Sequence, residues 1–155
     1  MDDQTLDQYI DRLQTAVSTA MRKIGSDLSE LQGLTGPQFF IMNLLYKNGK
    51  YTVTELADKI SVKPSAVTVM IDRLYKNGYV LRERDEHDRR VVILQLSDAG
   101  RLLFEQALEK RKKVLRQYMA YMDQEELEFL VKIYEKFALV VEKVHGENHA
   151  HQQNE

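Results

Sequence analysis

The chain has 155 residues, 43% hydrophobic and 30% charged, and a net charge of -2, enough for one domain, or one interwoven pair of subdomains, with a buried core. It contains no cysteine, which excludes disulfides, thiol catalysis, thiol redox sensing and cysteine-based zinc sites and makes a cytoplasmic protein the default expectation. The first residues, MDDQTLDQYI, are acidic and polar, and no apolar run approaches the roughly 18 residues of a membrane span, so no membrane partner is expected.

The first part of the chain carries the periodicity and the boundary signals of helices. Apolar residues recur at steps of three and four over about residues 3 to 26, which predicts an amphipathic helix. Thr35 and Gln38 then form a capping-box pattern, with Pro37 in the first turn, where its missing N–H costs nothing. A second helix is therefore expected over about residues 36 to 47.

Two shorter helices, separated by a tight turn, are expected next. Thr52 with Glu55 is a second capping-box pattern, and the helix that it starts should end near Ser61. Proline is favoured in the first helical turn, and the residue before a proline disfavours helical geometry, so a new helix should open at Pro64. This helix is expected over residues 64 to 77, where Asn-Gly supplies a stop signal.

A charged loop between two β-rich runs follows. YVLRER and VVILQLS are rich in β-formers and flank DEHDRR, so residues 79 to 97 are expected to form a hairpin. Its tip is crowded, because residues 83 to 90 hold four acidic groups, three basic groups and a histidine. Two long amphipathic helices are expected afterwards, over about residues 98 to 121 and from 123, with fraying beyond Gly146.

The segment ELADKISVKPSAVTVMIDRL, residues 55 to 74, has the spacing of a helix-turn-helix. The apolar or small residues suited to a steep helix crossing are Leu56, Ala57, Ile60, Val62, Val67, Met70, Ile71 and Leu74. The residues left on the outer face of the second helix are Ser65, Thr68, Val69, Asp72, Arg73 and Lys76. Hydroxyls and the free N–H groups of a helix N-terminus suit phosphates and base edges, which favours a DNA recognition helix. A plain helical hairpin explains the apolar positions equally well, but not the arginine-rich hairpin that follows.

A β-hairpin directly after a recognition helix is typical of a DNA-binding wing. The narrow, negative minor groove favours a guanidinium at the wing tip, and a carboxylate two residues away, as Asp88 is from Arg90, would pre-organise it. Residues 59 to 90 hold eight Lys/Arg and five Asp/Glu in a chain that is otherwise acidic, which suits the same surface. Without the preceding helices, an ordinary solvated turn would be the default interpretation of this tip.

The stretches VTVMIDRLYKNGYV and DRRVVILQLS, in an order of elements that spans nearly the whole chain, resemble the MarR family of bacterial transcription regulators. The resemblance implies a mainly α fold with a small β-hairpin wing, assembled as a triangular homodimer with interlocked terminal helices. It implies helical dimerisation over residues 1–32 and 98–146, a winged helix-turn-helix over 33–97 and a disordered tail over 147–155.

The resemblance also implies a repressor that releases DNA when a small aromatic or anionic ligand, an oxidant or a metal arrives, although a chain without cysteine cannot use cysteine oxidation. No cofactor is expected. The residues then expected to contact double-stranded DNA are Lys63, Pro64, Ser65, Thr68, Val69, Arg73, Arg84, Asp88, Arg89 and Arg90. Val69 departs from the polar or basic residue that the family often has, so its expected contact is apolar, to a thymine methyl.

A homodimer also follows from the geometry of DNA. One helix and one wing cover one half-site, so two related by a dyad should bind a pseudopalindrome with half-sites about 34 to 36 Å apart. Apolar stripes available for the interface include Leu13, Val17, Ile133, Phe137 and Val141, although part of each stripe can instead be intramolecular core.

Other interpretations compete with these expectations. His145, His149 and His151 are weak metal-ligand candidates for a metal-sensing regulator, and amphipathic helices alone would suit an interaction protein that binds no DNA. No glycine-rich phosphate loop, nucleophile elbow or acid pair in an apolar context favours an enzyme. Aromatic residues that suit either a ligand cavity or, more simply, core packing are Tyr9, Phe39, Phe40, Tyr46 and Tyr51.

Overall fold

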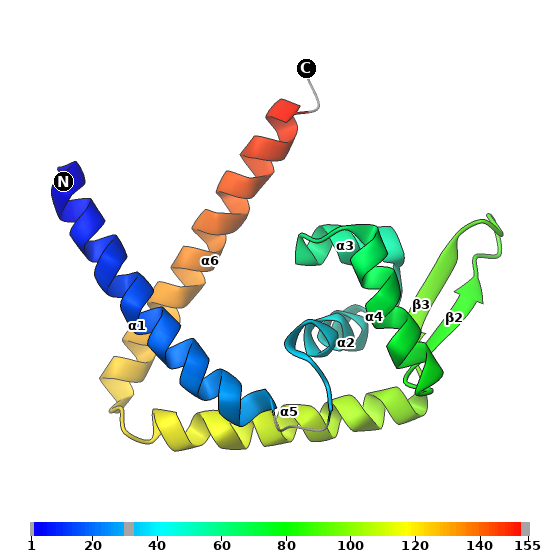
Figure 1. The fold of residues 1–155 in the computed structure, drawn as a ribbon, viewed down its shortest axis with the longest axis horizontal. Helices are drawn as coiled ribbons and strands as arrows, with labels where there is room; N and C mark the ends of the chain where they lie inside the picture. Colours follow the sequence, from blue (N-terminus) through cyan, green and yellow to red (C-terminus); the bar gives the residue numbers. More distant parts are fainter. Residues whose placement is uncertain (1, 30–32, 153–155) are drawn as a thin grey trace. The chain divides into compact units, whose positions relative to one another are not determined.

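The structure is a computed structural model. It describes the backbone of residues 2–29 and 33–152, and the side chains of residues 2–28 and 33–144. The elements, in chain order (Figure 1), are α1 (Asp3–Ser29), α2 (Gly36–Asn48), β1 (Tyr51–Thr52), α3 (Val53–Ile60), α4 (Pro64–Lys76), β2 (Val80–Arg84), β3 (Val92–Leu96), α5 (Asp98–Met119) and α6 (Gln124–Gln152). The chain divides into two compact units after Val114, within α5.

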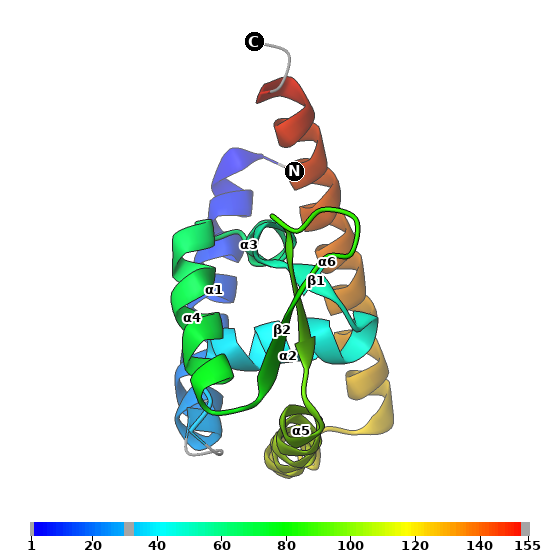
Figure 2. The ribbon, with the colours of Figure 1, turned by 90° about the vertical axis from the view of Figure 1, so that its right-hand side faces the viewer.

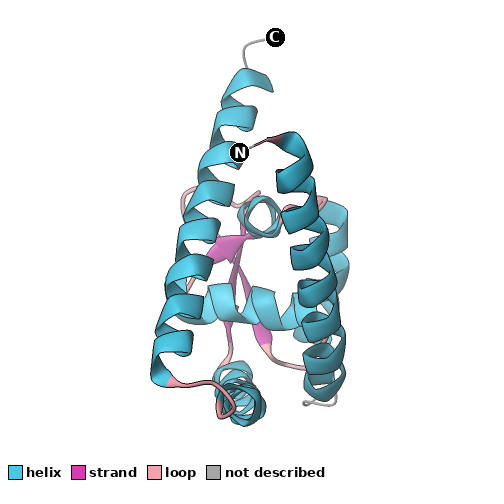
Figure 3. Cartoon of the chain, turned by 90° about the vertical axis from the view of Figure 1, so that its left-hand side faces the viewer, coloured by secondary structure: helices cyan, strands magenta, loops and turns pink. Residues whose placement is uncertain are grey.

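The first unit contains a small antiparallel sheet of strand order β1-β3-β2. The central strand β3 pairs with β2 over all five residues of each strand, and with β1 only through Ile93 and Leu94. β2 and β3 form a hairpin that runs alongside α4, as Figure 2 shows. Figure 3 shows how small the sheet is in an otherwise helical chain. The mainly α fold with a β-hairpin is therefore confirmed.

The core of this unit consists of side chains contributed by α2, α3, α4, β2, β3 and the first turns of α5. The buried members are Ile41, Met42, Leu45, Leu56, Ala57, Val67, Ile71, Leu74, Val80, Leu94 and Phe104. Full burial of one large aliphatic or aromatic side chain is worth about 1.5–3 kcal/mol relative to exposure. The helix-turn-helix and the base of the hairpin therefore share one core, which fixes them relative to each other.

Three of the five aromatic residues that suit either a cavity or the core belong to the core. The rings of Phe39 and Tyr46 lie 5.0 and 5.1 Å from the ring of Phe104, in tilted arrangements, and Tyr51 packs against the same cluster. The other two are exposed: Tyr9 by 56% and Phe40 by 45%. Core packing is thus confirmed for Phe39, Tyr46 and Tyr51.

The helix starts follow the capping signals of the sequence. Thr35 Oγ1 accepts the backbone N–H of Gln38 at 3.4 Å, and Gln38 Oε1 accepts the backbone N–H of Thr35 at 3.0 Å. Thr52 and Glu55 make the same reciprocal pair, at 3.2 and 2.7 Å. Each pair satisfies two N–H groups that the first helical turn leaves without partners. Both predicted capping boxes are confirmed, and Pro64 begins α4 as predicted.

The base of the hairpin is locked onto the start of α5. Ser97 Oγ accepts the backbone N–H of Gly100 at 2.9 Å and donates to the carbonyl of Gly78 at 2.6 Å. The backbone N–H of Ser97 donates to the carbonyl of Tyr79 at 3.1 Å. A Cβ atom on Gly100 would lie 1.9 Å from that carbonyl oxygen, so only glycine permits this approach of helix and strand.

The structure differs from the sequence expectations at three places. The strand β1 is not predicted, because two residues carry no periodicity and pair only through contacts that are distant in sequence. Val62, expected in the helix crossing, is 40% exposed in the turn between α3 and α4. Fraying is expected beyond Gly146, whereas the backbone of α6 is helical to Gln152, since a single glycine costs a helix only about 1 kcal/mol.

The long helices α1 and α6 leave large apolar side chains in solvent. On α1 these are Leu6, Tyr9, Ile10, Leu13 and Met21, and on α6 they are Phe129, Val131, Ile133, Tyr134, Phe137, Leu139, Val140, Val141 and Val144. None of the helices in the described part of the chain combines the length and the apolar character that crossing a bilayer requires. In the single chain, these apolar side chains of α1 and α6 are left uncovered.

Candidate nucleic-acid interface

Helices α3 and α4 cross as a helix-turn-helix. Leu56 and Ala57 of α3 are buried against Val67, Ile71 and Leu74 of α4 in the common core. Ala57 is small at the crossing, so the two backbones can approach each other closely. The predicted crossing is confirmed, and the opposite face of α4 is left free for another role.

The outer face of α4 carries the polar residues that the sequence predicts there. Ser65, Thr68 and Arg73 are exposed, and Val69 is 53% exposed among them. The Thr68 hydroxyl donates to the carbonyl of Pro64 at 3.0 Å, so its oxygen keeps lone pairs that can accept a hydrogen bond. This face therefore offers hydroxyls, a guanidinium and one apolar contact along a single helix.

The N-terminus of α4 is open to solvent. Lys63 stands at the N-cap position without a side-chain capping bond, and Pro64 is the first helical residue; both are exposed. Pro64 has no N–H, and the N–H groups of Ala66 and Val67 donate to the carbonyl of Lys63, so the N–H of Ser65 is left for an outside acceptor. Such a donor and the positive end of the helix dipole attract phosphate. A lysine at the N-cap adds a full charge of the same sign.

The wing is the hairpin β2–β3 with its loop, residues 85 to 91. Side chains alternate along β2: Val80 is buried in the core, and Arg82 and Arg84 follow on the same face. Glu83 lies on the opposite face, where it accepts a hydrogen bond from Gln95 at 2.6 Å and lies 3.8 Å from the ammonium group of Lys50. The face of β2 that is buried at Val80 is thus cationic farther toward the tip, at Arg82 and Arg84.

A turn centred on Asp85 orders the wing tip. The Asp85 carboxylate accepts the backbone N–H groups of His87 at 2.8 Å and of Asp88 at 3.0 Å. The N–H of Asp88, then that of His87 and the nearby imidazole, hold the pKa of the Asp85 carboxyl below its usual value. His87 itself is 95% exposed at its side chain, as expected from the sequence.

The predicted contact between Asp88 and Arg90 is present. Asp88 Oδ1 accepts the backbone N–H of Arg90 at 3.0 Å and lies 3.5 Å from its Nε atom. The Arg90 side chain is nevertheless 94% exposed, so its guanidinium is oriented and still accessible. An exposed pair of this kind contributes little to stability, which leaves orientation as its main effect.

The remaining predicted cations are accessible. Arg73, Arg84 and Arg89 are exposed and form no ion pair with any residue that the structure describes. Uncompensated guanidinium groups on one side of a domain create a local positive potential even when the net charge is negative. The surface made by α4 and the wing therefore suits a polyanion.

One contact in this surface is not predicted from the sequence. Arg82 of β2 forms an ion pair with Asp72 of α4, and its guanidinium lies 4.8 Å from the centre of the Tyr75 ring. The sequence does show that Asp72 and Tyr75 share one face of the helix and that Arg82 lies on the same face of its strand as Val80. It does not show that these two faces meet, because that depends on how β2 packs on α4.

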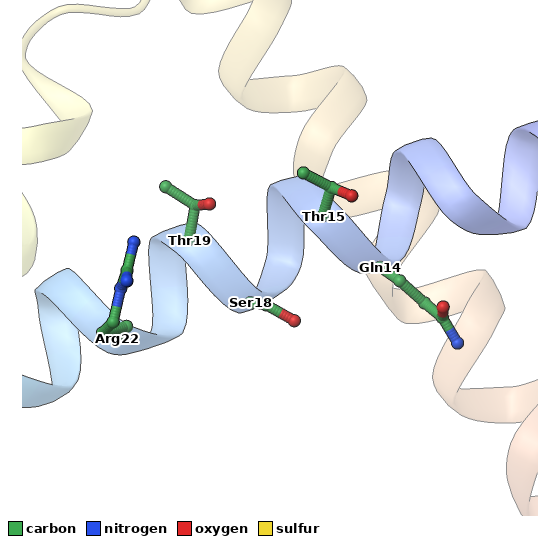
Figure 4. Close-up of a pocket in the computed structure, with 5 residues that line it drawn as sticks. All are labelled: Gln14, Thr15, Ser18, Thr19 and Arg22. Carbon is green, nitrogen blue, oxygen red and sulfur yellow. The ribbon is translucent and has the colours of Figure 1, made fainter.

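Two surface hollows in the described part of the chain do not resemble a ligand site. One hollow of about 420 Å³ is bordered by Gln14, Thr15, Ser18, Thr19 and Arg22, all from α1, as Figure 4 shows. A second is also lined by α1 alone. Ligand pockets bury most of the ligand surface, which the side of a single helix cannot do.

The structure does not test the predicted metal-ligand candidates. The side chains of His145, His149 and His151 lie outside the described residues. Among the residues whose side chains are described, no group of three or more acidic or histidine side chains is placed to hold a metal ion.

The fold and this surface define a winged helix-turn-helix protein. The family model described as the MarR family matches residues 34–92. The HTH-type transcriptional repressor MdtR of Bacillus subtilis is 34% identical over 145 residues, which are 92% of this chain and 94% of that protein. This chain belongs to the MarR family, whose members are transcription regulators and not enzymes.

Solved structures support the assignment. A MarR family protein from Bacillus stearothermophilus has a TM-score of 0.77 and 28% identity, covering 91% of this chain and 98% of that one. A mutant of E. coli MarR, solved in complex with operator DNA, has a TM-score of 0.68 and 25% identity, covering 88% and 99% of the two chains.

Proposed function

We propose that this protein is a ligand-responsive repressor that binds a pseudopalindromic DNA operator as a homodimer, through α4 and the wing. The observation that carries the proposal is the exposed surface that α4 and the arginine-tipped hairpin form on one shared core. Two relatives support it: MdtR is a repressor, and the mutant E. coli MarR was solved with operator DNA.

In this proposal α4 enters the major groove. Lys63 and the backbone N–H of Ser65 bind a phosphate, while the hydroxyls of Ser65 and Thr68 contact base edges or phosphates. Arg73 binds a phosphate farther along the helix. Val69 makes an apolar contact with a thymine methyl, since it is half exposed beside the hydroxyl positions and has no hydrogen-bonding group.

The wing binds the flanking minor groove. Arg90 enters the groove, oriented by Asp88, because a guanidinium held in place loses less rotamer entropy on binding. Arg84 and Arg89 bind the phosphates on either side of it. The carboxylates of the tip limit nonspecific affinity, because they offset part of the positive charge.

The dimer is proposed to form through the apolar side chains that α1 and α6 expose. Phe137 is 58% exposed and Leu13 is 57% exposed in the single chain. A second copy would cover such residues, and a dyad would set two recognition helices one turn of DNA apart. Because its proposed partner is DNA, the protein is proposed to act in the cytoplasm.

The proposed effector is a small aromatic or anionic molecule that changes the distance between the two recognition helices. It must bind the mismatched arrangement more tightly than the DNA-binding one, since equal affinity shifts nothing. Identical separation of the two helices with and without a DNA-releasing compound, measured by spin labels on α4, would contradict this mechanism.

Selection of bound fragments from random DNA tests the proposed function. We expect an enriched inverted repeat with half-sites one helical turn apart, bound by one dimer in a gel shift. Arg90→Ala should weaken that complex, whereas Lys47→Ala, which removes an exposed cation from α2, should change it little. Recovery of no enriched sequence from a folded sample would contradict the proposal.

A further inference from the structure

We infer that Asp72, Arg82 and Tyr75 form a brace that sets the angle of the wing relative to the recognition helix, and that Asp72 is a positioning residue for operator binding. The inference rests on the proposed DNA-binding function and adds residues to it. None of the three belongs to the predicted DNA-contact set.

The brace stands near the level where the third strand of the sheet ends. Strand β1 pairs with β3 at Leu94 and Ile93, which lie opposite Arg82 and Glu83 of β2. Beyond them the wing consists of one strand pair, Arg84 with Val92, and the loop of residues 85 to 91. A two-stranded ribbon is only marginally stable by itself, so its direction depends on the support at its base.

Arg82 provides this support on the side of α4. Its side chain is 32% exposed, and it reaches across the helix to the Asp72 carboxylate while its guanidinium lies 4.8 Å from the Tyr75 ring centre. A planar guanidinium that is both paired and stacked is held in orientation as well as in position. On the opposite face Glu83 pairs with Lys50, the residue before β1, at 3.8 Å, and neither has a hydrogen bond or ion pair to α4 among the described residues.

A small rotation at the base of the wing produces a large displacement of its tip, which is why the brace affects DNA binding. At about 3.3 Å per residue, the wing tip lies about 16 Å beyond Arg82, so a rotation of about 10° at the base moves the tip by about 3 Å. Hydrogen bonds to a groove or a phosphate do not survive such a displacement. A wing released from α4 should therefore lose its minor-groove contacts while the major-groove contacts of α4 remain.

The sign of the Asp72→Asn effect separates this idea from simple electrostatics. Removing a negative charge near DNA should strengthen binding if charge alone matters, because DNA is a polyanion. The brace predicts weaker binding instead, by about tenfold, which is within the range of losing one groove-binding arginine. Glu83→Gln is the matched control, since it removes one negative charge from the wing without touching α4; its affinity should be unchanged or slightly higher.

The experiment uses the full-length protein and the operator obtained by DNA selection. Affinity is measured by fluorescence anisotropy, and hydroxyl-radical footprinting reports the flanking minor groove separately from the central major groove. For Asp72→Asn we expect weaker binding and loss of the flanking protection, with the central protection retained. The charge-swapped double variant Asp72→Arg with Arg82→Asp should recover most of the lost affinity.

Each outcome decides one claim. The inference about the brace is wrong if the Asp72→Asn variant binds DNA as tightly as the Glu83→Gln variant, or if it keeps the flanking footprint. The proposed function stands in either case. Failure of the unmodified protein to bind any selected duplex overturns the proposed function itself. Should Asp72→Asn fold poorly, a charge-swapped variant that folds and does not recover binding also overturns the brace.

Discussion

Gly100→Ala is expected to destabilise the first unit through a single added methyl group. Gly100 is buried in α5, and an added Cβ would lie 1.9 Å from the carbonyl oxygen and 2.8 Å from the carbonyl carbon of Tyr79. Both atoms belong to the backbone, so no rotamer change relieves the overlap. Either α5 or the strand that leads into the wing must shift.

Two opposing effects set the magnitude. Alanine in place of glycine stabilises a helix interior by about 1 kcal/mol. Inserting a methyl group into a close-packed site costs about 1–3 kcal/mol, and here the displaced carbonyl also accepts the N–H of Ser97 at 3.1 Å. Weakening that hydrogen bond adds about 1 kcal/mol. With about 2 kcal/mol for the inserted methyl group, the middle of that range, the three contributions give an expected net loss of about 2 kcal/mol.

Urea unfolding at a fixed protomer concentration measures this loss, since the stability of a dimer depends on concentration. With an m-value of about 2 kcal/mol per M, the midpoint should fall by about 1 M. Gly36→Ala is the control: an added Cβ at Gly36 meets no atom within 4 Å, so its effect should stay within about 0.5 kcal/mol. A Gly100→Ala variant as stable as the unmodified protein would refute the reasoning.

Three further predictions concern the wing and a helix cap. Arg90→Ala should weaken operator binding by about 1–3 kcal/mol in anisotropy titrations, and the double variant with Asp88→Ala should lose less than the sum; additive losses would contradict the orienting ion pair. Thr52→Ala should cost about 1 kcal/mol in urea unfolding because it removes the hydroxyl oxygen that accepts the backbone N–H of Glu55. Thr54→Ala, exposed in the same helix, should cost less than half of that. The backbone amides of His87 and Asp88 should report a pKa of the Asp85 carboxyl below about 3.9 in NMR titration. Since this pKa is lowered by folding, the turn is stabilised above the unfolded-state pKa and loses that support as the pH falls through the folded-state pKa; a midpoint above about 3.9 would contradict the two hydrogen bonds.

Local signals predicted most of the fold. Capping residues act within four positions of the sequence, so Thr35 with Gln38 and Thr52 with Glu55 identify helix starts without knowledge of the tertiary structure. The hairpin was predictable for the same reason, because β-formers and its charged loop are adjacent in the chain. The pair of Asp88 and Arg90 could be proposed from a spacing of two residues.

Features that depend on packing were not predictable from spacing. Strand β1 exists only because Ile93 and Leu94 lie beside Tyr51 and Thr52, which are distant from them in the sequence. The ion pair of Arg82 joins a strand to a helix, so neither periodicity alone identifies it. Val62 is exposed because Ser61, the residue before it, has a left-handed backbone conformation. Glycine is the usual residue in that conformation, so a serine gives no sequence signal of it.

The salt dependence of operator binding tests the central claim most directly. Lys63, Arg73, Arg84 and Arg89 are exposed in each protomer, so a dimer can neutralise about eight phosphates. The logarithm of the binding constant should then fall with the logarithm of salt concentration at a slope of about -7. Removing Arg73 and Arg89 together should reduce that slope by about half. A folded protein that binds no duplex at low salt, or binds with no salt dependence, would contradict a surface built to hold a double helix.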